Sequence, residues 1–558
     1  MIYSKHFKRL TACLFFVLMG CFLIDGIVYA EEKLVTLHRI AQSGGHCFCI
    51  MLGKDTTVDG SVICAQSEES GDCEIRLRYV PAASHRPGEK RVVQLWNVWD
   101  KRVPGSIGLP VRSGPTIEIP QVEHTYAYIE STLQVMNEHQ VAVAEAALGG
   151  TRIELSSSKN SDAKLKTTDT SRIALERATT AREAIKIMAS LYEEHGYTTW
   201  HSGVGESLAL SDKNEVWVFE FLPVGPNWKK GSGEPGVLWC AMRIPDDKVA
   251  VNANESIIGE INLKDPDNFM ASSNVKSLAI EHGWWNPKSG KPFRWDLAYT
   301  GKKANSLRTW RALSLLAPSQ NLKPNAEEYP NPIKPDKKLS ILDIREIYAD
   351  HFEGTEFDQT KGLAAGPFGS PDRPRGTPNR IYSLCQIYVD TIHIHQSRNW
   401  LPDPIGGVTW VGMSPGDTNV FVPFYAGITR LPGAYTTGAR TKFSWDSAFW
   451  LFSLVSNWAR LNYCHTIKEI KKVQHALESA ELNRQAGIDE EAWKLYQESP
   501  DLAREFLTDY CIDNANKVLD AWRELASFLI AWYNPGSAFH EQFDPTDWWR
   551  EAVLKKEK

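Results

Sequence analysis

GGHCFCIMLG, at residues 44–53, is the stretch that decides the fold of this chain. Its apolar, β-prone second half leads to the polar turn Asp59-Gly60-Ser61 and then to a second apolar run, Val62–Ala65. The two runs predict a β-hairpin whose first strand begins at Cys47. If the chain is cut between His46 and Cys47, Cys47 carries both a thiol nucleophile and a free α-amine that can act as its base. That pair of groups is sufficient for acyl transfer.

The N-terminus has the three-part pattern of a secretory signal peptide. Basic residues within 5–9 precede the apolar stretch Leu10–Ile24, and Val28-Tyr29-Ala30 supplies a small-residue cleavage site. The stretch is short for a membrane span and is followed by Asp25-Gly26. We therefore expect residues 1–30 to be a signal peptide and the protein to be exported to the periplasm or the extracellular space. Lipid attachment at Cys21, in a sequence similar to a bacterial lipoprotein box, is the alternative.

Residues 31–46 form a short segment between the predicted signal peptide and Cys47. The segment has no helical or strand period, and it ends in Ser43-Gly44-Gly45-His46. A loose, polar segment directly before a nucleophilic cysteine suits a propeptide that is released between His46 and Cys47. An ordinary flexible tail is the alternative interpretation.

The composition of the chain indicates a globular protein and argues against a nucleic-acid-binding one. The chain has 558 residues, 42% of them hydrophobic and 23% charged, which is usual for a globular protein with a large core. The net charge of −6 provides no basic surface for nucleic acid. We find no apolar run after the signal that could span a bilayer stably. A homo-oligomer and the pairing of the cysteines are left open.

Strands and helices are predicted in blocks, which indicates an α+β fold and not regular βαβ alternation. Residues 47–445 are expected to form the catalytic domain, with Pro/Gly-rich loops at 318–340 and 361–378, and 446–558 a helical C-terminal region packed on it. A capping box at Thr180–Glu183 starts a helix that Gly196 closes. A hairpin turn is expected at 135–140, leading into an alternating strand at 141–144. Further strands are expected at 207–210, 216–221, 237–244, 249–253, 381–394 and 408–413, and further helices at 308–316, 340–352 and 445–532.

No metal or other cofactor is predicted. His393 and His395 share one face of a predicted strand and could hold a metal, but no Asp, Glu or Cys lies at ligand spacing. The sequence also has no glycine-rich phosphate loop.

Several separate blocks of the chain resemble the C69 dipeptidases, the dipeptidase A group of the N-terminal-nucleophile (Ntn) hydrolases. Cys47 and Asp59-Gly60-Ser61 have the family spacing. The similarity continues in order to about Trp458. The other blocks are Met136–His139, Gly205–Ser207, Asn214–Trp217, Trp239–Asp247, Ala253-Asn254, Arg308–Leu313, Gln396–Asp403 and Phe421–Ile428.

The resemblance implies an αββα four-layer sandwich, here with an added helical region at the C-terminus. Penicillin V acylases and bile salt hydrolases are more distant relatives on this fold. By position, the resemblance implies Cys47 as nucleophile, Glu69 as the acid at its α-amine, Asn254 as oxyanion donor and Arg308 as a further site residue. Asn137, in the turn after Met136, is a further candidate.

Three positions depart from the pattern that the resemblance implies. Gln66 stands where relatives show Arg, and Glu69 stands where they show Asp. Ala146 or Ala147 stands where relatives often carry Thr or Asn at a second oxyanion position. These departures put the geometry of the site and the choice of substrate in question.

The resemblance predicts an exported cysteine-type dipeptidase that cleaves small peptides through a thioester. An N-acyl amide hydrolase on the same fold is the first alternative. A non-catalytic secreted binding protein, suggested by the 20 Trp residues, is the second. A binding protein has no need for a processable cysteine, so Cys47 argues against the second alternative.

Overall fold

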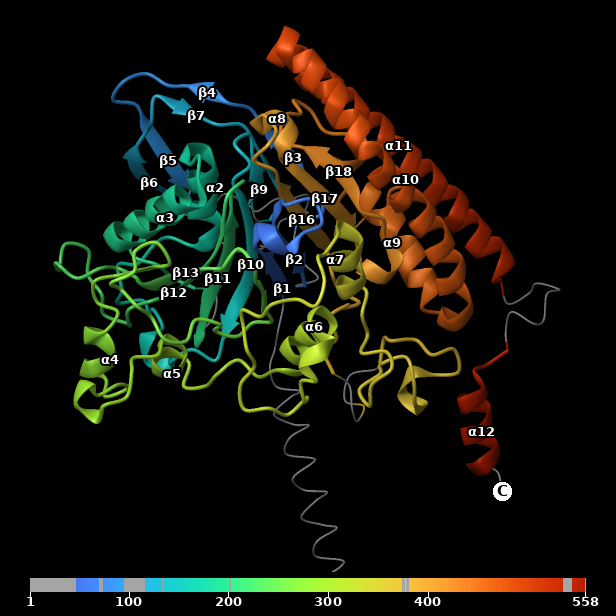
Figure 1. The fold of residues 1–558 in the computed structure, drawn as a ribbon, viewed down its shortest axis with the longest axis horizontal. Coiled ribbons are helices and arrows are strands. Elements are labelled where there is room, and N and C mark those ends of the chain that lie inside the picture. Colours follow the sequence, from blue (N-terminus) through green and yellow to red (C-terminus); the bar gives the residue numbers. More distant parts are fainter. Residues whose placement is uncertain are drawn as a thin grey trace, which may run out of the picture.

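The computed structural model describes residues 47–69, 74–94, 116–132, 134–199, 202–373, 377, 381–440, 442–534 and 544–556. The predicted signal peptide, the predicted propeptide with His46, and Cys73 lie outside the described residues. The chain folds into two antiparallel sheets with helices on their outer faces, as Figure 1 shows. The predicted α+β class is confirmed, with the layer order helix, sheet, sheet, helix.

The first sheet has six strands in the order β14-β1-β2-β16-β17-β18. Every neighbouring pair in it is antiparallel. Its strands are β1 Cys47–Leu52, β2 Val62–Glu68, β14 Val249–Asn252, β16 Thr391–Ser397, β17 Val408–Met413 and β18 Val422–Tyr425.

The predicted hairpin at the start of the described chain is confirmed. Every residue of β1 and β2 is buried, because this sheet is covered on both faces. In the connection, Asp59 Oδ1 accepts hydrogen bonds from the Ser61 backbone N–H (3.1 Å) and hydroxyl (2.6 Å). Gly60 between them has φ +85°, a conformation that favours glycine. The Asp-Gly-Ser motif thus shapes the turn that returns β2 beside Cys47.

The second sheet has eight strands in the order β15-β13-β12-β11-β10-β9-β8-β3. Its strands are β3 Arg78–Val80, β8 Tyr128–Glu130, β9 Gln134–Asn137, β10 Ala142–Gly149, β11 Val204–Ser211, β12 Val216–Leu222, β13 Leu238–Arg243 and β15 Phe269–Ala271. Two small two-stranded sheets join β4 Ala83–Ser84 with β7 His124–Thr125 and β5 Lys90–Gln94 with β6 Thr116–Pro120.

Helices α2 (Thr167–Arg177) and α3 (Ala181–His195) cover the outer face of the second sheet (Figure 1). The predicted start of α3 is confirmed, because the Thr180 hydroxyl accepts from the Glu183 backbone N–H at 3.2 Å. Gly196 ends the helix with φ +72°. An added Cβ there would lie 2.5 Å from Trp228.

The outer face of the first sheet packs against helices from the second half of the chain. The Tyr348 hydroxyl donates to the Phe48 carbonyl at 3.2 Å, and their rings meet edge to face. Four of the helices in this half are α6 Leu307–Leu316, α7 Ile341–Tyr348, α9 Ala448–Ala459 and α11 Pro500–Trp532. The others are α4 Ser277–Glu281, α5 Trp295–Tyr299, α8 Asp403–Gly406, α10 Tyr463–Glu498 and α12 Asp547–Lys556.

The structure corrects two predicted boundaries. The strand predicted over 381–394 begins only at Thr391, because Ser383 and Gln386 hydrogen-bond within the preceding segment. The helix predicted over 340–352 ends at Tyr348. None of the helices in the described ranges combines the length and apolar character that a bilayer crossing needs.

Candidate active site

Cys47 stands at the first position of β1, with 8% of its surface exposed. In the antiparallel pair β1–β2 it lies opposite Glu68, and Cys49 lies opposite Gln66. Residues that face each other across such a pair project on the same side of the sheet. The side chains of Cys47, Glu68, Cys49 and Gln66 therefore share the face that is turned away from Phe48.

Arg308, from the first turn of α6, joins three of the predicted site residues. Its Nη1 donates to the Cys47 carbonyl at 3.2 Å and to Asn254 Oδ1 at 3.4 Å, and its Nη2 donates to Glu69 Oε1 at 2.6 Å. The guanidinium also lies over the Phe48 ring, 5.4 Å from its centroid. Cys47, Glu69, Asn254 and Arg308 thus meet at one point, although more than 250 residues separate Cys47 from Arg308.

Glu69 directly follows the end of β2 and is fully buried. The Ser67 hydroxyl donates to Glu69 Oε1 at 2.6 Å, beside the ion pair with Arg308. Burial raises the pKa of the Glu69 carboxyl, and the contacts with Arg308 and Ser67 oppose that rise. The acid is therefore held in one orientation by two donors from different elements.

Asn254 occupies a tight turn after β14, with φ +65°. Its side-chain amide donates to the Ala147 carbonyl at 2.9 Å, and its backbone N–H donates to Asn252 Oδ1 at 2.9 Å. Asn is one of the few residues that adopt this left-handed conformation readily. Arg308 donates to Oδ1, and the second amide hydrogen of Asn254 has no acceptor among the described residues.

Asn137 has a different environment. Its amide nitrogen donates to the carbonyls of Leu175 (3.0 Å) and Ala178 (2.8 Å), and its oxygen accepts from the backbone N–H groups of His139 and Val141. All its hydrogen bonds hold the β9–β10 turn against the end of α2. The structure therefore gives Asn137 a structural environment, away from the group around Arg308.

The Cys47 thiol lies in an acidic environment. Burial raises its pKa well above the usual value, Glu145 and Glu68 raise it further, and the Glu69 backbone N–H lowers it. Glu145, on β10 of the facing sheet, and its neighbour Glu206, on β11, were missed by sequence reasoning. The available signal was a single carboxylate in each of two otherwise apolar or small-residue strands, AVAEAALG and VGESLALS.

The predicted histidine pair lies on the same face, two strands from β1. His393 pairs with Gln66 and His395 with Cys64, and their ring centroids are 5.9 Å apart. Burial lowers the pKa of His393 to about 4 and that of His395 well below its usual value, so both rings are neutral near pH 7. They belong to no three-residue ligand group within the described ranges.

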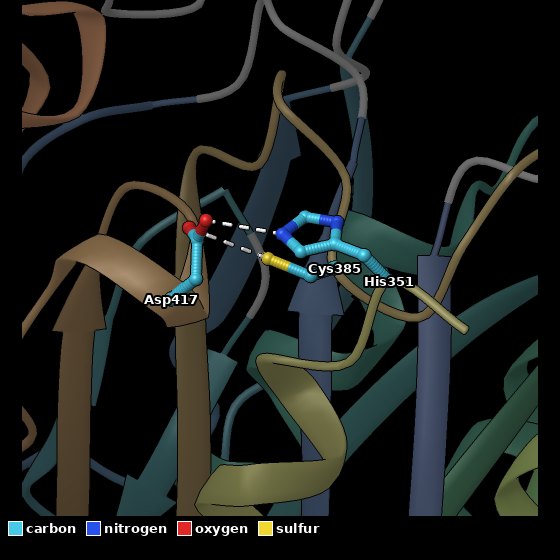
Figure 2. Close-up of side chains that lie close together, drawn as sticks. All are labelled: His351, Cys385 and Asp417. Carbon is cyan, nitrogen blue, oxygen red and sulfur yellow. Dashed lines mark hydrogen bonds and ion pairs between the residues drawn. The ribbon is translucent and has the colours of Figure 1, made fainter. Parts of the chain in front are cut away.

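Figure 2 shows the one group of three potential ligands within the described part of the chain, His351, Cys385 and Asp417. His351 Nε2 lies 3.0 Å from Asp417 Oδ2, and Cys385 Sγ lies 3.5 Å from Asp417 Oδ1. Arg460 already contacts both oxygens of Asp417, at 2.6 and 2.9 Å, and the Tyr463 hydroxyl donates to one of them.

The contacts of this second cluster are those of a buried ion-pair network that holds separate segments of the chain together. Burial disfavours the charge of Asp417, but Arg460 and His351 hold the pKa of its carboxyl well below the usual value. A metal ion bound here would lie against the Arg460 guanidinium. The cluster instead connects the segment after α7 and the loop before β18 to the junction between α9 and α10.

Comparison with known proteins places these residues in a family. The profile of peptidase family C69 matches residues 46–476, which is most of the chain. A protein named dipeptidase A from Lactobacillus helveticus is 26% identical over 427 residues, covering 75% of this chain and 82% of that protein. One named probable dipeptidase B from Streptococcus pyogenes serotype M1 is 22% identical over 499 residues, covering 87% and 92%. One named probable dipeptidase from Latilactobacillus sakei is 30% identical over 275 residues, covering 49% of this chain and 52% of that protein.

Proposed function

The chain belongs to peptidase family C69, and from that membership we propose that it is a dipeptidase that uses Cys47 as an N-terminal nucleophile. The observation that carries the proposal is the convergence on Arg308 of the Cys47 carbonyl, Glu69 and Asn254. The names of the relatives, dipeptidase A and dipeptidase B, support the choice of substrate class.

In the proposed maturation, the protein is exported and the bond between His46 and Cys47 is cut. The support is the signal-like pattern of residues 1–30 and the position of Cys47 at the head of β1. Cutting would convert the Cys47 amide nitrogen into an amine with a pKa of about 7.7–8 in unperturbed peptides. That amine and the thiol would belong to the same residue, so the amine would lie close enough to accept the thiol proton.

In the proposed reaction, the thiol attacks the scissile carbonyl while the α-amine takes its proton. A local base is needed because burial and nearby carboxylates raise the thiol pKa, so little free thiolate exists near neutral pH. The amine then protonates the leaving amino acid, and water hydrolyses the thioester. Arg308 orients the Cys47 backbone, and Glu69 provides negative charge near the α-ammonium.

The tetrahedral intermediate carries a negative oxygen that needs fixed donors. Asn254 is the best side-chain candidate, because its amide is already oriented by the Ala147 carbonyl and by Arg308. Donors of this kind typically contribute about 2.7–4 kcal/mol to the stability of the transition state. Rigid donors stabilise the developing charge without reorganising during the reaction.

The test is an activity screen of the purified protein, with Ala- and Gly-containing dipeptides set against N-acyl amino acids. We expect hydrolysis of the dipeptides, loss of activity in Cys47→Ala and after thiol alkylation, and an active chain whose mass begins at Cys47. Full activity in a chain that retains Glu31 at its N-terminus would refute the free-amine mechanism. Hydrolysis of only the N-acyl substrates would favour the acylase alternative.

A further inference from the structure

A short turn of the chain links the two side chains that meet beside Cys47. The turn follows β14 and contains Asn254, the candidate oxyanion donor, with Glu255 directly after it. Helix α6 approaches the same turn and carries Arg308 near its start. Asn254 and Arg308 are 54 residues apart in the sequence. Their relative position therefore depends on what connects the turn to the helix.

Glu255 makes that connection. The residue is 2% exposed, and its Oε2 accepts from the Ser306 backbone N–H at 2.9 Å and from the Thr309 hydroxyl at 3.0 Å. Its Oε1 accepts from the Asn305 backbone N–H at 3.3 Å. The first N–H groups of a helix have no partner within the helix, and the helix dipole favours negative charge at that end. A carboxylate at position 255 is therefore well suited to hold the start of α6.

A second buried carboxylate fixes the other side of the turn. Glu220, on β12, is fully buried, and its Oε1 accepts from the Ile257 backbone N–H at 2.9 Å. Its Oε2 accepts from the Ser256 hydroxyl at 2.6 Å and from the Trp295 indole N–H, on α5, at 2.7 Å. Because the turn is bonded to β12 and α5 in this way, the contacts of Glu255 set where α6 begins relative to the turn.

The remaining contact of Glu255 is an ion pair with a cation that water reaches. Lys302 Nζ lies 3.3 Å from Glu255 Oε1, and the Lys302 side chain is 46% exposed. Ion pairs screened by water contribute little, so this cation fixes the position of the carboxylate less than the donors of α6 do. The reach of the Glu255 side chain should thus matter more than its charge.

We propose that Glu255 is a positioning residue of the reaction. It holds the first turn of α6 at the place from which Arg308 contacts both the Cys47 carbonyl and Asn254. Glu255 acts through these residues and not on the substrate. The inference rests on the proposed dipeptidase function, which gives Arg308 and Asn254 their roles.

The experiment measures kcat and KM on alanylalanine for three replacements of Glu255, well below each thermal midpoint. Glu255→Ala removes every contact with α6, and we expect kcat to fall by about 10- to 100-fold with KM changed less than about threefold, because small displacements of catalytic groups cost this much. Glu255→Gln keeps the length and an oxygen acceptor, so kcat should stay within about threefold of wild type. Glu255→Asp keeps the charge but is one methylene shorter, and should lose about 10-fold.

Asp212→Ala is the matched control for Glu255→Ala. Asp212 is also 2% exposed, and its carboxylate accepts from the Ala181 backbone N–H at the start of α3, on the outer face of the second sheet. Its loss should lower the thermal midpoint but leave kcat unchanged. Equal losses of kcat in the two alanine variants would overturn the proposal, because general destabilisation would then explain both.

The order of the other two variants is the second test, and it holds even if Glu255→Ala fails to fold. Turnover retained by Glu255→Asp and lost by Glu255→Gln would overturn the proposal, since charge and not position would then be decisive. Amide hydrogen exchange at Ser306 should be faster in Glu255→Asp than in wild type, and unchanged exchange would also overturn it. A wild type that hydrolyses no dipeptide would refute the dipeptidase function, whereas an active enzyme insensitive to position 255 would refute only the positioning role.

Discussion

Arg308 and Glu69 form an ion pair of 2.6 Å in which both side chains are almost completely buried. The pair connects α6 to the end of β2, and the same guanidinium reaches the carbonyl of Cys47. The net contribution of a buried ion pair to the free energy of unfolding is small. Removing only one partner costs more, because the other charge is then buried without a counter-ion.

Removing one charge of this pair should therefore destabilise the protein more than removing both. We expect Arg308→Gln to lower the free energy of unfolding by about 3–5 kcal/mol, because Glu69 is left buried without its cation. The double variant Arg308→Gln/Glu69→Gln should recover a large part of that loss. Urea unfolding of the wild type, both single variants and the double variant measures the coupling. A double variant no more stable than Arg308→Gln would contradict the assignment.

Asn254 should contribute to turnover more than to stability. We expect Asn254→Gly to lower kcat by about 10²–10³, the usual cost of losing one oxyanion donor. Glycine is the appropriate replacement, since it removes the amide but keeps φ +65° accessible, whereas alanine would add backbone strain of about 1–2 kcal/mol.

The control for Asn254 is the rate of Cys47 alkylation together with the thermal midpoint. Both should stay close to wild type in Asn254→Gly. Near-normal turnover of this variant on every substrate tested would exclude Asn254 as the oxyanion donor.

His393 should make the protein less stable in acid. Its pKa is lowered from 6.5 to about 4 by burial, so the unfolded chain binds a proton in this range before the folded chain does. The stability that neutral His393 contributes is thus present above about pH 6.5 and is lost as the pH falls toward 4. Between about pH 7.5 and pH 5 the loss should be about 2 kcal/mol.

The measurement is the free energy of unfolding at those two pH values in wild type and in His393→Gln. The variant should reduce the difference by about that amount. His124→Gln, which changes an exposed histidine, is the matched control and should reduce it much less. An unchanged difference in His393→Gln would show that the ring is not buried in its neutral form.

We expect the cluster around Asp417 to stabilise the fold through its ion pairs and not to bind a metal ion. Asp417→Asn would leave Arg460 and His351 without their carboxylate, and we expect the free energy of unfolding to fall by about 3–5 kcal/mol. The chelator EDTA should change neither the thermal midpoint nor the activity of the wild type. A midpoint that falls in EDTA and returns with added zinc would reverse this interpretation.

Much of the fold was predictable because the local sequence patterns match the strands and helices that pack in the structure. The hairpin at Cys47 and helix α3 both have apolar patterns bounded by turn or capping residues that the structure uses as expected. Helix α2 was missed because nearly all its residues are buried although many are polar, such as Thr170 and Asp169, so it has no apolar stripe to detect. The segment before Thr391 was misassigned because its apolar residues fill the core without strand pairing.

The site was only partly predictable. Cys47, Glu69, Asn254 and Arg308 were found through the family resemblance, since their approach depends on contacts between distant segments that no local pattern reveals. Glu145 and Glu206 were missed because a carboxylate in a strand is usually solvated, and only the helices on the outer face of the second sheet make these two buried. Their burial depends on how the layers of the fold pack together, which the sequences of the two strands do not reveal.

The long C-terminal helices set a limit on how the protein can be shortened. The family profile ends at residue 476, in the middle of α10, yet the indole of Trp522 on α11 is fully buried and lies 5.2 Å from the Phe452 ring. A chain trimmed to the limits of the family profile would lose part of its hydrophobic core. The smallest unit that can fold therefore runs through α11, beyond the end of that profile.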